Sequence, residues 1–387
     1  MKTVDLIYFN AGGGHRAAAQ ALEQSMAWRP WRVRLVNLTE MLDPQGVFRR
    51  LTGVEPEDIY NRHLASGFTL GLTQQLKMVQ GVIKFSHNTL VQRLRLHWLK
   101  TEPDLVVSLI PNFNRALCES LVSVLPGVPY VTVLTDMADC PPNFWIEPDL
   151  PGQQLVCGTA HAAAQALAAG CAPERVHRAS GMVLRPAFYA LPLLDRDAER
   201  RARGLDTRQP VGLVLFGGRG TAAMKQIANR LPDVPLILMC GHNRMLADEL
   251  RAMPSRAPRV VVEFTPDVAR WMRLADFFIG KPGPGSLSEA VHMRLPVIVM
   301  RNKRTMPQER WNTEWVRVHG LGVVYGSYRG LRAAVDETLA RLPELQTNLR
   351  RMHNRAVFEV PQVLERLMDH GDGASTPRYA RSGLLLP

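Results

Sequence analysis

Cysteine is scarce in this sequence, and the few cysteines are not paired along the chain. The 387 residues include five cysteines, and no two of them have the CxxC spacing. A disulfide framework usually has an even number of cysteines, and a structural zinc site needs closely spaced cysteines. The sequence therefore excludes a small cross-linked scaffold and predicts reduced thiols that are buried like small apolar side chains.

Long hydrophobic runs are missing as well. No apolar run approaches the roughly 18 residues that a membrane-spanning helix needs. The longest runs, such as 105–110 and 129–134, have the length of buried strands. At the N-terminus, Asp5 interrupts the apolar stretch 4–9, which argues against a signal peptide.

Acidic residues are in short supply. Lys and Arg number 47 and Asp and Glu 35, which gives a net charge of +12. Apolar residues make up 46% and charged residues 21%, which is ordinary for a globular protein and excludes a disordered chain. The stretch 59–101 has no acidic residue and combines basic with apolar side chains. It predicts a surface for anionic lipid, and the alternative is a helical insertion that packs on the first domain. We expect a cytoplasmic protein, peripheral to the inner face of the cell membrane.

Strand-like and helical stretches alternate along the chain, which is typical of parallel α/β domains. In the first half we expect a helix over 15–26 and strands at 4–9, 32–36, 104–110, 129–135, 154–157 and 175–179. After a linker at 180–186, strands are expected at 211–216, 236–240, 260–264, 276–279 and 296–300, with helices from there to about residue 369. We predict two Rossmann-like domains, at 1–186 and 187–357. A helix at 358–370 should return to the first domain, and a disordered tail should follow at 371–387.

Three glycines lie between the first expected strand and the first expected helix. Gly12, Gly13 and Gly14 let the backbone turn sharply and approach a ligand closely, and the helix N-terminus that follows favours negative charge. His15 comes next and titrates near neutral pH, so it is a candidate to accept a proton from a hydroxyl. The alternative is a structural turn with a capping histidine.

The second half has two further glycine-rich loops where strands end. The loop 217–221 resembles a phosphate-binding loop at a helix start, although it lacks the GxxxxGK[ST] pattern of a P-loop. In the next loop Gly283, Gly285 and Ser286 offer backbone N–H groups to a phosphate. Glu289, one turn later, has a carboxylate that can bridge two vicinal hydroxyls.

A cluster of polar side chains, Gln308, Glu309 and Asn312, lies at an expected loop–helix boundary. Amide and carboxylate groups together suit a ligand with many hydroxyls. For this cluster and for Glu289 the alternative is a polar helix start that is favoured by the helix dipole without any ligand.

These motifs together resemble those of the GT-B glycosyltransferases of family 28, and most of all the monogalactosyldiacylglycerol synthases and bacterial diacylglycerol glucosyltransferases. The resemblance is specific at 12–17, at 283–286 with Glu289, and at Gln308-Glu309 with Asn312. It is weaker at 239–243 and at Thr135-Asp136, and in all it covers about 4–27, 130–146 and 181–326. It implies an α/β protein with the GT-B fold, in which an acceptor-binding and a nucleotide-sugar-binding domain, both Rossmann-like, face each other across a cleft.

The resemblance also implies roles for individual residues. His15 would be the catalytic base, with Asp136 as the second candidate. Gly12, Gly13, Gly14 and Trp145 would face the acceptor. The residues that would bind a UDP-sugar donor are Gly217, Gly218, Arg219, Gly220, Thr221, Gly241, Asn243, Gly283, Gly285, Ser286, Glu289, Gln308, Glu309 and Asn312.

We therefore expect an inverting glycosyltransferase that moves a hexose or N-acetylhexosamine from a UDP-sugar to a diacylglycerol-like lipid. Backbone N–H groups with Arg219 or Lys281 would stabilise the departing diphosphate, and no metal or other cofactor is expected. Two alternatives share the fold: a nucleotide-sugar epimerase, and a glycosyltransferase that acts on a polyprenyl-linked cell-envelope precursor. Nucleic acid is not expected as a partner, because the basic residues are spread along the chain without a recognised motif.

Overall fold

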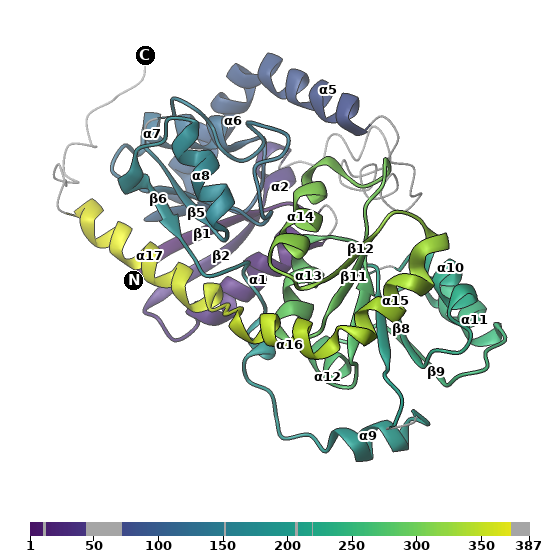
Figure 1. Ribbon diagram of the computed structural model, residues 1–387. Coiled ribbons are helices and arrows are strands. Elements are labelled where there is room, and N and C mark those ends of the chain that lie inside the picture. The colour runs from purple at the N-terminus through teal and green to yellow at the C-terminus, as the bar shows by residue number, and fades with distance from the viewer. Residues whose placement is uncertain (11–12, 44–71, 151, 206–207, 219, 373–387) are drawn as a thin grey trace, which may run out of the picture.

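Two parallel β-sheets form the framework of the molecule (Figure 1). The structure is a computed structural model, and it describes residues 1–10, 13–43, 72–150, 152–205, 208–218 and 220–372. Gly12, Arg219 and the first part of the acid-free stretch, 59–71, lie outside the described residues. None of the described helices is both long and apolar enough to cross a bilayer.

The first sheet has six strands in the order β2-β1-β3-β4-β5-β6, all parallel. Its strands and helices are β1 (Lys2–Tyr8), α1 (Gly14–Met26), β2 (Trp31–Asn37), α2 (Leu38–Leu42), α5 (Leu72–Phe85), α6 (His87–Thr101), β3 (Leu105–Ser108), α7 (Asn114–Val124), β4 (Tyr130–Val133), β5 (Gln153–Cys157), α8 (Ala160–Ala168) and β6 (Val176–Arg178). Every residue of β3 and β4 is buried, because helices cover both faces of the sheet.

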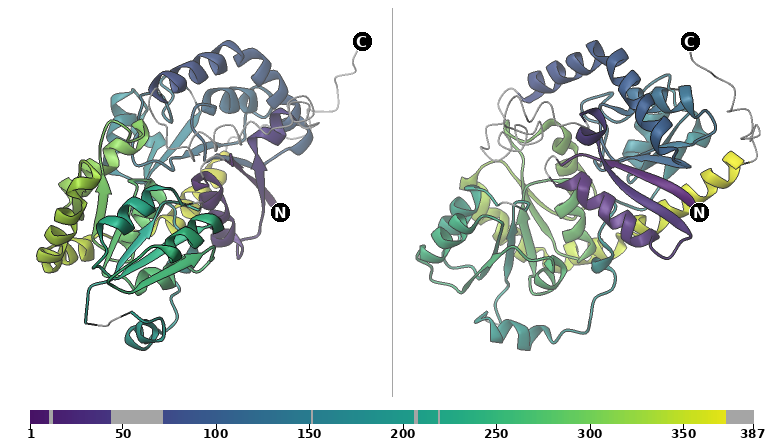
Figure 2. Two further views of the ribbon diagram at one scale, coloured as in Figure 1. Left: turned by 90° about the vertical axis from the view of Figure 1, so that its right-hand side faces the viewer. Right: turned by 180° about the vertical axis from the view of Figure 1, so that it is seen from behind.

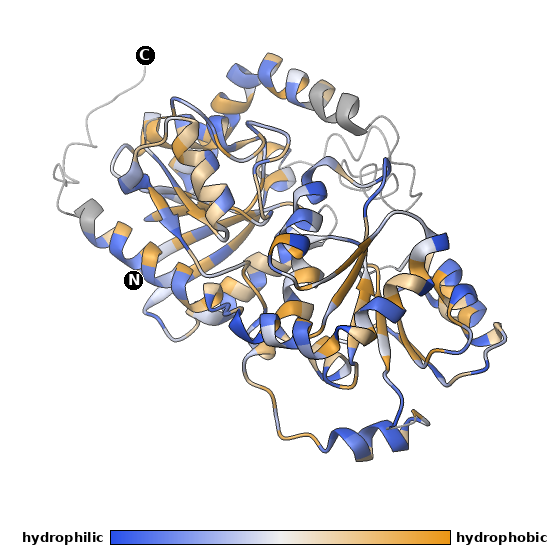
Figure 3. Cartoon of the chain, viewed as in Figure 1, coloured by the Kyte–Doolittle hydropathy of each residue, from blue (hydrophilic) through white to orange (hydrophobic). Residues whose placement is uncertain are grey.

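The second sheet also has six parallel strands, in the order β12-β11-β10-β7-β8-β9. Its strands and helices are α9 (Arg196–Ala202), β7 (Gly212–Leu215), α10 (Ala223–Arg230), β8 (Leu236–Gly241), α11 (Arg244–Ala252), β9 (Arg259–Glu263), α12 (Val268–Arg273), β10 (Phe277–Gly280), α13 (Pro284–His292), β11 (Val297–Met300), α14 (Arg310–Val318), β12 (Gly322–Tyr325), α15 (Leu331–Ala340) and α16 (Leu342–Arg351). Figure 3 shows the hydrophobic colour concentrated in the strands of both sheets.

One strand corrects the sequence analysis, which expected only helices after residue 300. Gly322–Tyr325 forms β12 and pairs with β11 in parallel at the edge of the sheet. The strand has four residues and begins with a glycine, so its pattern is that of a turn between helices. The glycine is required there, because a Cβ at Gly322 would lie 1.9 Å from the backbone oxygen of Val297.

The C-terminal helix α17 (Ala356–Asp372) packs on the first domain (Figures 1 and 2). Its residues Val360 and Leu364 are buried in the same hydrophobic cluster as Ala18 and Leu22 of α1. Pro361 lies inside the helix without ending it. Since α16 covers the second domain and α17 covers the first, the end of the chain ties the two domains together.

Arg29 holds this helix through an ion pair, and the rings of Trp28 and Trp31 in the first domain pack against its guanidinium. Its side chain is 4% exposed, it pairs with Glu365 of α17 at 2.5 Å, and its guanidinium lies 4.7 Å from the ring centroid of Trp31. We expect Arg29→Ala to lower the local unfolding free energy of α17 by about 2 kcal/mol, because a buried charge contact and its ring packing are lost together. Hydrogen exchange of the α17 amides measures this.

The control for that experiment is Lys2→Ala. It removes the more exposed ion pair of the same helix, between Lys2 and Asp369 at 3.6 Å. Exposed pairs contribute little, so exchange in α17 should change far less. Equal effects of the two substitutions would contradict the anchoring role of Arg29.

Candidate functional site

The candidate site lies where the loops at the carboxyl ends of the two sheets meet. Ligands of open α/β sheets bind at this edge. The first domain contributes the loops after β1, β3 and β4, and the second contributes the loops after β7, β8, β10 and β11. Two observations bring the loops of the two domains together: charges of the second domain act on Asp136 of the first, and the rings of His161 and Trp311 stack across the interface.

His15 is fixed in one orientation at the start of α1. Gly13 before it has φ +79°, a conformation that glycine adopts without strain. The Nδ1–H of His15 donates to the carbonyl oxygen of Leu109 at 2.8 Å, and the hydroxyl of Thr135 lies 3.0 Å from the same nitrogen. Because Nδ1 carries the proton, Nε2 keeps its lone pair.

Burial keeps this imidazole neutral. It lowers the pKa of His15 to about 4, against a smaller opposing effect of the bond to Leu109. At neutral pH the side chain is therefore an unprotonated base, and Nε2 carries its lone pair. That is the state in which an imidazole can take a proton from an attacking hydroxyl.

Asp136 follows β4 and is 8% exposed. Its Oδ2 accepts a hydrogen bond of 2.9 Å from the indole Nε1–H of Trp145. Burial raises the pKa of Asp136 to about 7; Trp145 and Lys281 oppose the rise, while the charge of Glu309 adds to it. Because Lys281 and Glu309 belong to the second domain, Asp136 lies at the interface between the domains.

The placement of Trp145 changes its predicted role. The sequence analysis expected it to face the acceptor, but its side chain is fully buried and its indole is bound to Asp136. Its backbone N–H and that of Phe144 donate to the carboxylate of Asp139 at 2.6 and 3.0 Å. Trp145 therefore orients Asp136, and Asp139 shapes the loop that holds Trp145.

Asn114 connects this loop to the loop after β3, and the sequence analysis missed it. It is fully buried, and its Nδ2 donates to the carbonyl oxygens of Ile110 and Trp145 at 3.1 and 3.3 Å. Nearby, the side chain of Gln80 on α5 donates to Asn112 at 3.1 Å. A buried amide on the first turn of α7 that binds two loop carbonyls supports the loops that hold His15 and Asp136.

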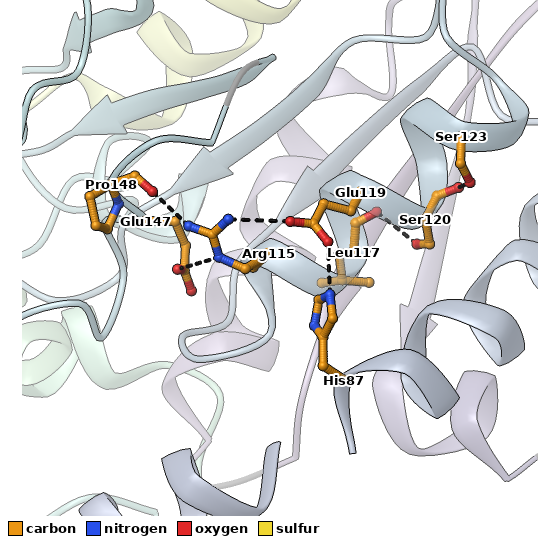
Figure 4. A network of polar contacts seen from close by, with 8 residues as sticks. All are labelled: His87, Arg115, Leu117, Glu119, Ser120, Ser123, Glu147 and Pro148. Atoms are coloured by element: carbon orange, nitrogen blue, oxygen red, sulfur yellow. Dashed lines mark hydrogen bonds and ion pairs between the residues drawn. The ribbon is translucent and has the colours of Figure 1, made fainter. Parts of the chain in front are cut away.

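A second polar network anchors α6 beside the same loop (Figure 4). His87, the first residue of α6, lies 2.7 Å from Glu119 of α7, and Arg115 pairs with Glu119 at 3.2 Å. Arg115 also donates to Glu147 at 3.3 Å and to the carbonyl oxygen of Pro148 at 2.6 Å. Helix α6 of the acid-free stretch is thus connected to Glu147 and Pro148, which follow Trp145 in the chain.

On the second domain, Lys281 and Glu309 form an ion pair of 2.7 Å. Glu309 is 5% exposed, and its charge is the main reason why the pKa of Lys281 is raised. Gly283 leaves room for the pair, since a Cβ there would lie 3.1 Å from the Lys281 side chain and 3.3 Å from Glu309. The pair places a positive charge next to the glycine loop that begins α13.

Two predicted sugar-binding side chains carry buried oxygens without a partner. Among the described residues, Oε1 of Gln308 and Oδ1 of Asn312 accept no hydrogen bond. The other end of Asn312 is fixed, because its Nδ2 donates to the carbonyl oxygen of Pro282 at 2.8 Å. Buried oxygens of this kind are costly unless a ligand or water donates to them, so they suit the hydroxyls of a bound sugar.

The loops after β7 and β8 pack against each other. Gly217 and Gly241 have φ +75° and +58°, and the backbone N–H of His242 donates to the carbonyl oxygen of Gly218 at 2.9 Å. A Cβ at Gly241 would lie 2.1 Å from that oxygen. The side-chain oxygen of Asn243 accepts a hydrogen bond of 3.0 Å from the backbone N–H of Leu246 and so caps the start of α11.

Glu289 lies on α13, whose first turn contains Gly285 and Ser286. Burial raises the pKa of Glu289, and the positive charge of Arg185 opposes the rise. Arg185 lies on the segment that joins the domains, with its Nη2 3.7 Å from Oε1 of Glu289. No sequence motif marks Arg185, and it was not predicted as a site residue.

This architecture is the GT-B fold, as the solved structures show. MurG from Acinetobacter baumannii superposes with a TM-score of 0.62 and 14% identity, over 95% of this chain and 100% of that one. The UDP co-structure of S. aureus MnaA gives a TM-score of 0.58 and 15% identity over 96% and 97% of the two chains. The predicted fold class is therefore confirmed.

Sequence comparison gives more specific relatives, although no family model matches the chain. Monogalactosyldiacylglycerol synthase 2 of Arabidopsis thaliana is 25% identical over 406 residues, which cover 98% of this chain and 83% of that protein. A protein of Oryza sativa subsp. indica, described as a probable monogalactosyldiacylglycerol synthase 2, is 26% identical over 355 residues, 83% of this chain and 70% of its own. The resemblance predicted from the motifs is confirmed, and the predicted enzyme class, a hexosyltransferase, agrees with these relatives.

Proposed function

We propose that this chain transfers a hexose or N-acetylhexosamine from a UDP-sugar to a diacylglycerol-like lipid, with inversion at the anomeric carbon. The observation that carries the proposal is the orientation of His15. Its Nδ1–H is bound to Leu109 and burial lowers its pKa to about 4, so the lone pair of Nε2 can accept a proton at neutral pH. An attacking hydroxyl needs such a base in a single displacement.

The second domain supplies the donor site in this proposal. Glu289 binds the ribose hydroxyls, and the backbone at Gly285 and Ser286 binds the diphosphate at the N-terminus of α13. Gln308 and Asn312 offer their unpartnered oxygens to the sugar hydroxyls. The departing diphosphate is stabilised by these backbone donors and by Lys281, without a metal. Asp136, oriented by Trp145, assists His15 or replaces it as the base.

Calorimetry with UDP tests the donor half of the proposal. We expect UDP to bind more tightly than ADP, GDP or TDP, in buffer without divalent cations. Glu289→Gln should weaken UDP binding about 10- to 100-fold, because hydrogen bonds to a charged group are lost. Glu263→Gln is the control, since Glu263 pairs with Arg251 on a half-exposed surface of the same domain. Equal affinities for the four diphosphates would contradict the donor assignment.

The acceptor half rests on the acid-free helices. Among the described side chains of α5 and α6, Met78, Val82 and Phe85 on α5 are exposed by 66%, 59% and 94%, and Leu96 and Leu99 on α6 by 69% and 54%. Lys84, Arg93 and Lys100 are exposed among them. We propose that this surface lies on anionic lipid and brings the first domain to its acceptor.

Vesicle sedimentation tests the membrane surface. The protein should bind vesicles with anionic lipid more strongly than purely zwitterionic ones, and Phe85→Asp with Val82→Asp should abolish most of that binding. Val318→Asp is the control, because Val318 is 72% exposed on the second domain. Unchanged binding of the double variant would overturn the membrane assignment and leave the donor assignment standing.

A further inference from the structure

A pair of aromatic rings joins the two domains beside the candidate site. His161 of α8 and Trp311 of α14 stack with their centroids 4.4 Å apart and their planes at 7°. The first residue belongs to the acceptor domain and the second to the donor domain. Neither residue was predicted as a site residue, because their contact joins segments that are far apart in the sequence.

On the first domain, the stack is tied to the loop of Asp136. Thr159 begins α8: its hydroxyl accepts the backbone N–H of Ala162 at 3.0 Å and donates to the carbonyl oxygen of Met137 at 2.6 Å. Met137 is the residue after Asp136. His161, on the first turn of α8, therefore has a fixed position relative to Asp136.

On the second domain, the stack is tied to the sugar-binding cluster. Trp311 lies between Arg310 and the fully buried Asn312, two residues after Glu309. Trp311 is partly buried and packs against the hydrophobic core of that domain. Burial raises the pKa of Cys140, and the positive charge of Arg310 opposes this rise. Arg310, at the start of α14, therefore lies near the Cys140 loop of the first domain.

We propose that the His161–Trp311 stack is a positioning contact which holds the sugar-binding turn of α14 at a fixed separation from the loop of Asp136. This proposal rests on the proposed function. It adds the contact that sets the distance between the loops of the first domain and those of the second. Transfer needs the donor sugar and the acceptor hydroxyl within reaction distance, and small displacements at such sites have large effects on rate. A site held closed also keeps water from the anomeric carbon.

The stack uses a neutral imidazole. Burial lowers the pKa of His161, and the position of this residue on the first turn of a helix also disfavours a positive charge there. A phenyl ring has the same flat apolar face, so phenylalanine should replace this histidine. Alanine keeps the helix but removes the ring.

The experiment compares how much UDP-sugar His161→Ala and His161→Phe transfer to lipid and how much they hydrolyse. Purified protein is incubated with labelled UDP-sugar and diacylglycerol-containing vesicles, and glycolipid and free sugar are both measured. We expect His161→Ala to lower kcat for transfer about tenfold, with at most a twofold change in UDP affinity, and to raise the ratio of hydrolysis to transfer. His161→Phe should restore both quantities to within about twofold of the original protein.

His319→Ala is the matched control. His319 contacts Trp315 of the same helix α14, at 5.6 Å between centroids, but both rings belong to the second domain. Its loss should leave the ratio of hydrolysis to transfer unchanged. If His161→Ala and His319→Ala behave alike, or if His161→Phe fails to rescue, the positioning role is wrong.

Small-angle X-ray scattering separates this proposal from the proposed function. Without any substrate, His161→Ala should increase the radius of gyration or broaden the interdomain distances, and His161→Phe should not. This result would support the stack even if no transfer activity were found. Scattering curves that are identical for the three proteins would overturn it even if the transferase assignment holds.

Discussion

Replacing His15 with alanine is expected to lower kcat for glycosyl transfer about 10²- to 10⁴-fold while the protein folds normally and binds UDP as before. The substitution removes an imidazole whose Nδ1–H is bound to the carbonyl of Leu109 and whose Nε2 keeps its lone pair at neutral pH. In the proposed function the donor binds to the second domain, so its affinity should not change. Steady-state transfer rates and UDP calorimetry on the same preparation measure the two quantities.

His97→Ala is the control for this prediction. Burial also lowers the pKa of His97 to about 4, and this histidine packs edge-on against Trp98 in α6, away from the carboxyl ends of the sheets. Its replacement should have little effect on kcat. A loss of less than about tenfold for His15→Ala, which is about 1.4 kcal/mol, would contradict its role as the base.

The pH profile distinguishes the two candidate bases. A base must be unprotonated, so activity is lost as the pH falls through its pKa. If His15 is the base, kcat/KM should stay level from pH 8 down to pH 5 and fall near pH 4. If Asp136 is the base, kcat/KM should already fall below about pH 7. We expect the first profile.

Replacing Lys281 with methionine is expected to lower kcat about 10²- to 10³-fold, which is the scale seen when one preorganised charge stabiliser is removed. The ammonium group lies beside the glycine loop of α13 and is held in place by Glu309 at 2.7 Å. A diphosphate that leaves toward this loop gains charge next to it. Transfer rates with saturating donor measure the effect on the reaction rather than on binding.

Two controls accompany Lys281→Met. Lys225→Met removes a lysine whose ion pair with Glu249, at 2.8 Å, is exposed on the surface, and it should leave kcat unchanged. Lys281→Met together with Glu309→Gln removes the buried carboxylate that the single substitution leaves without its cation. If the double variant recovers most of the lost activity, the lysine serves Glu309 and not the leaving group.

The sequence predicted the frame of the molecule because its strands are buried on both faces. Such strands are short, continuous apolar runs, as in β3 and β10, and glycines mark the points where they end. The same rule failed at β12, where a four-residue edge strand begins with Gly322. Its three apolar residues lie between Gly322 and Gly326, and so short a run between glycines is hard to distinguish from a turn.

The site could be predicted only where one short segment carries a function. His15 comes directly after a glycine loop at the start of α1, and Glu289 lies one turn beyond the next such loop, on α13, as expected. Arg185 and Trp311 have partners more than 100 residues away in the chain, and Asn114 joins the nearby Ile110 to Trp145, 31 residues away, so no local pattern marks their roles. These contacts follow from tertiary packing, which spacing along the sequence does not encode.

Trp145 shows the limit of carrying a role over from a motif. The family resemblance implied that Trp145 faces the acceptor, but the loop folds inward around Asp139 and buries the ring. The indole then serves as a hydrogen-bond donor to Asp136 at 2.9 Å. The backbone hydrogen bonds from Phe144 and Trp145 to Asp139 determine which way the indole points, and the residue type alone does not predict this.

The most direct test of the central claim is product analysis after a single incubation. Purified protein is mixed with anionic vesicles that contain diacylglycerol and with labelled UDP-galactose, UDP-glucose or UDP-N-acetylglucosamine, in EDTA. The account predicts that one of these donors yields UDP and a glycolipid whose new linkage is β, as shown by mass spectrometry and NMR. Epimerised or hydrolysed donor with no labelled lipid, or no consumption of any donor, would contradict it.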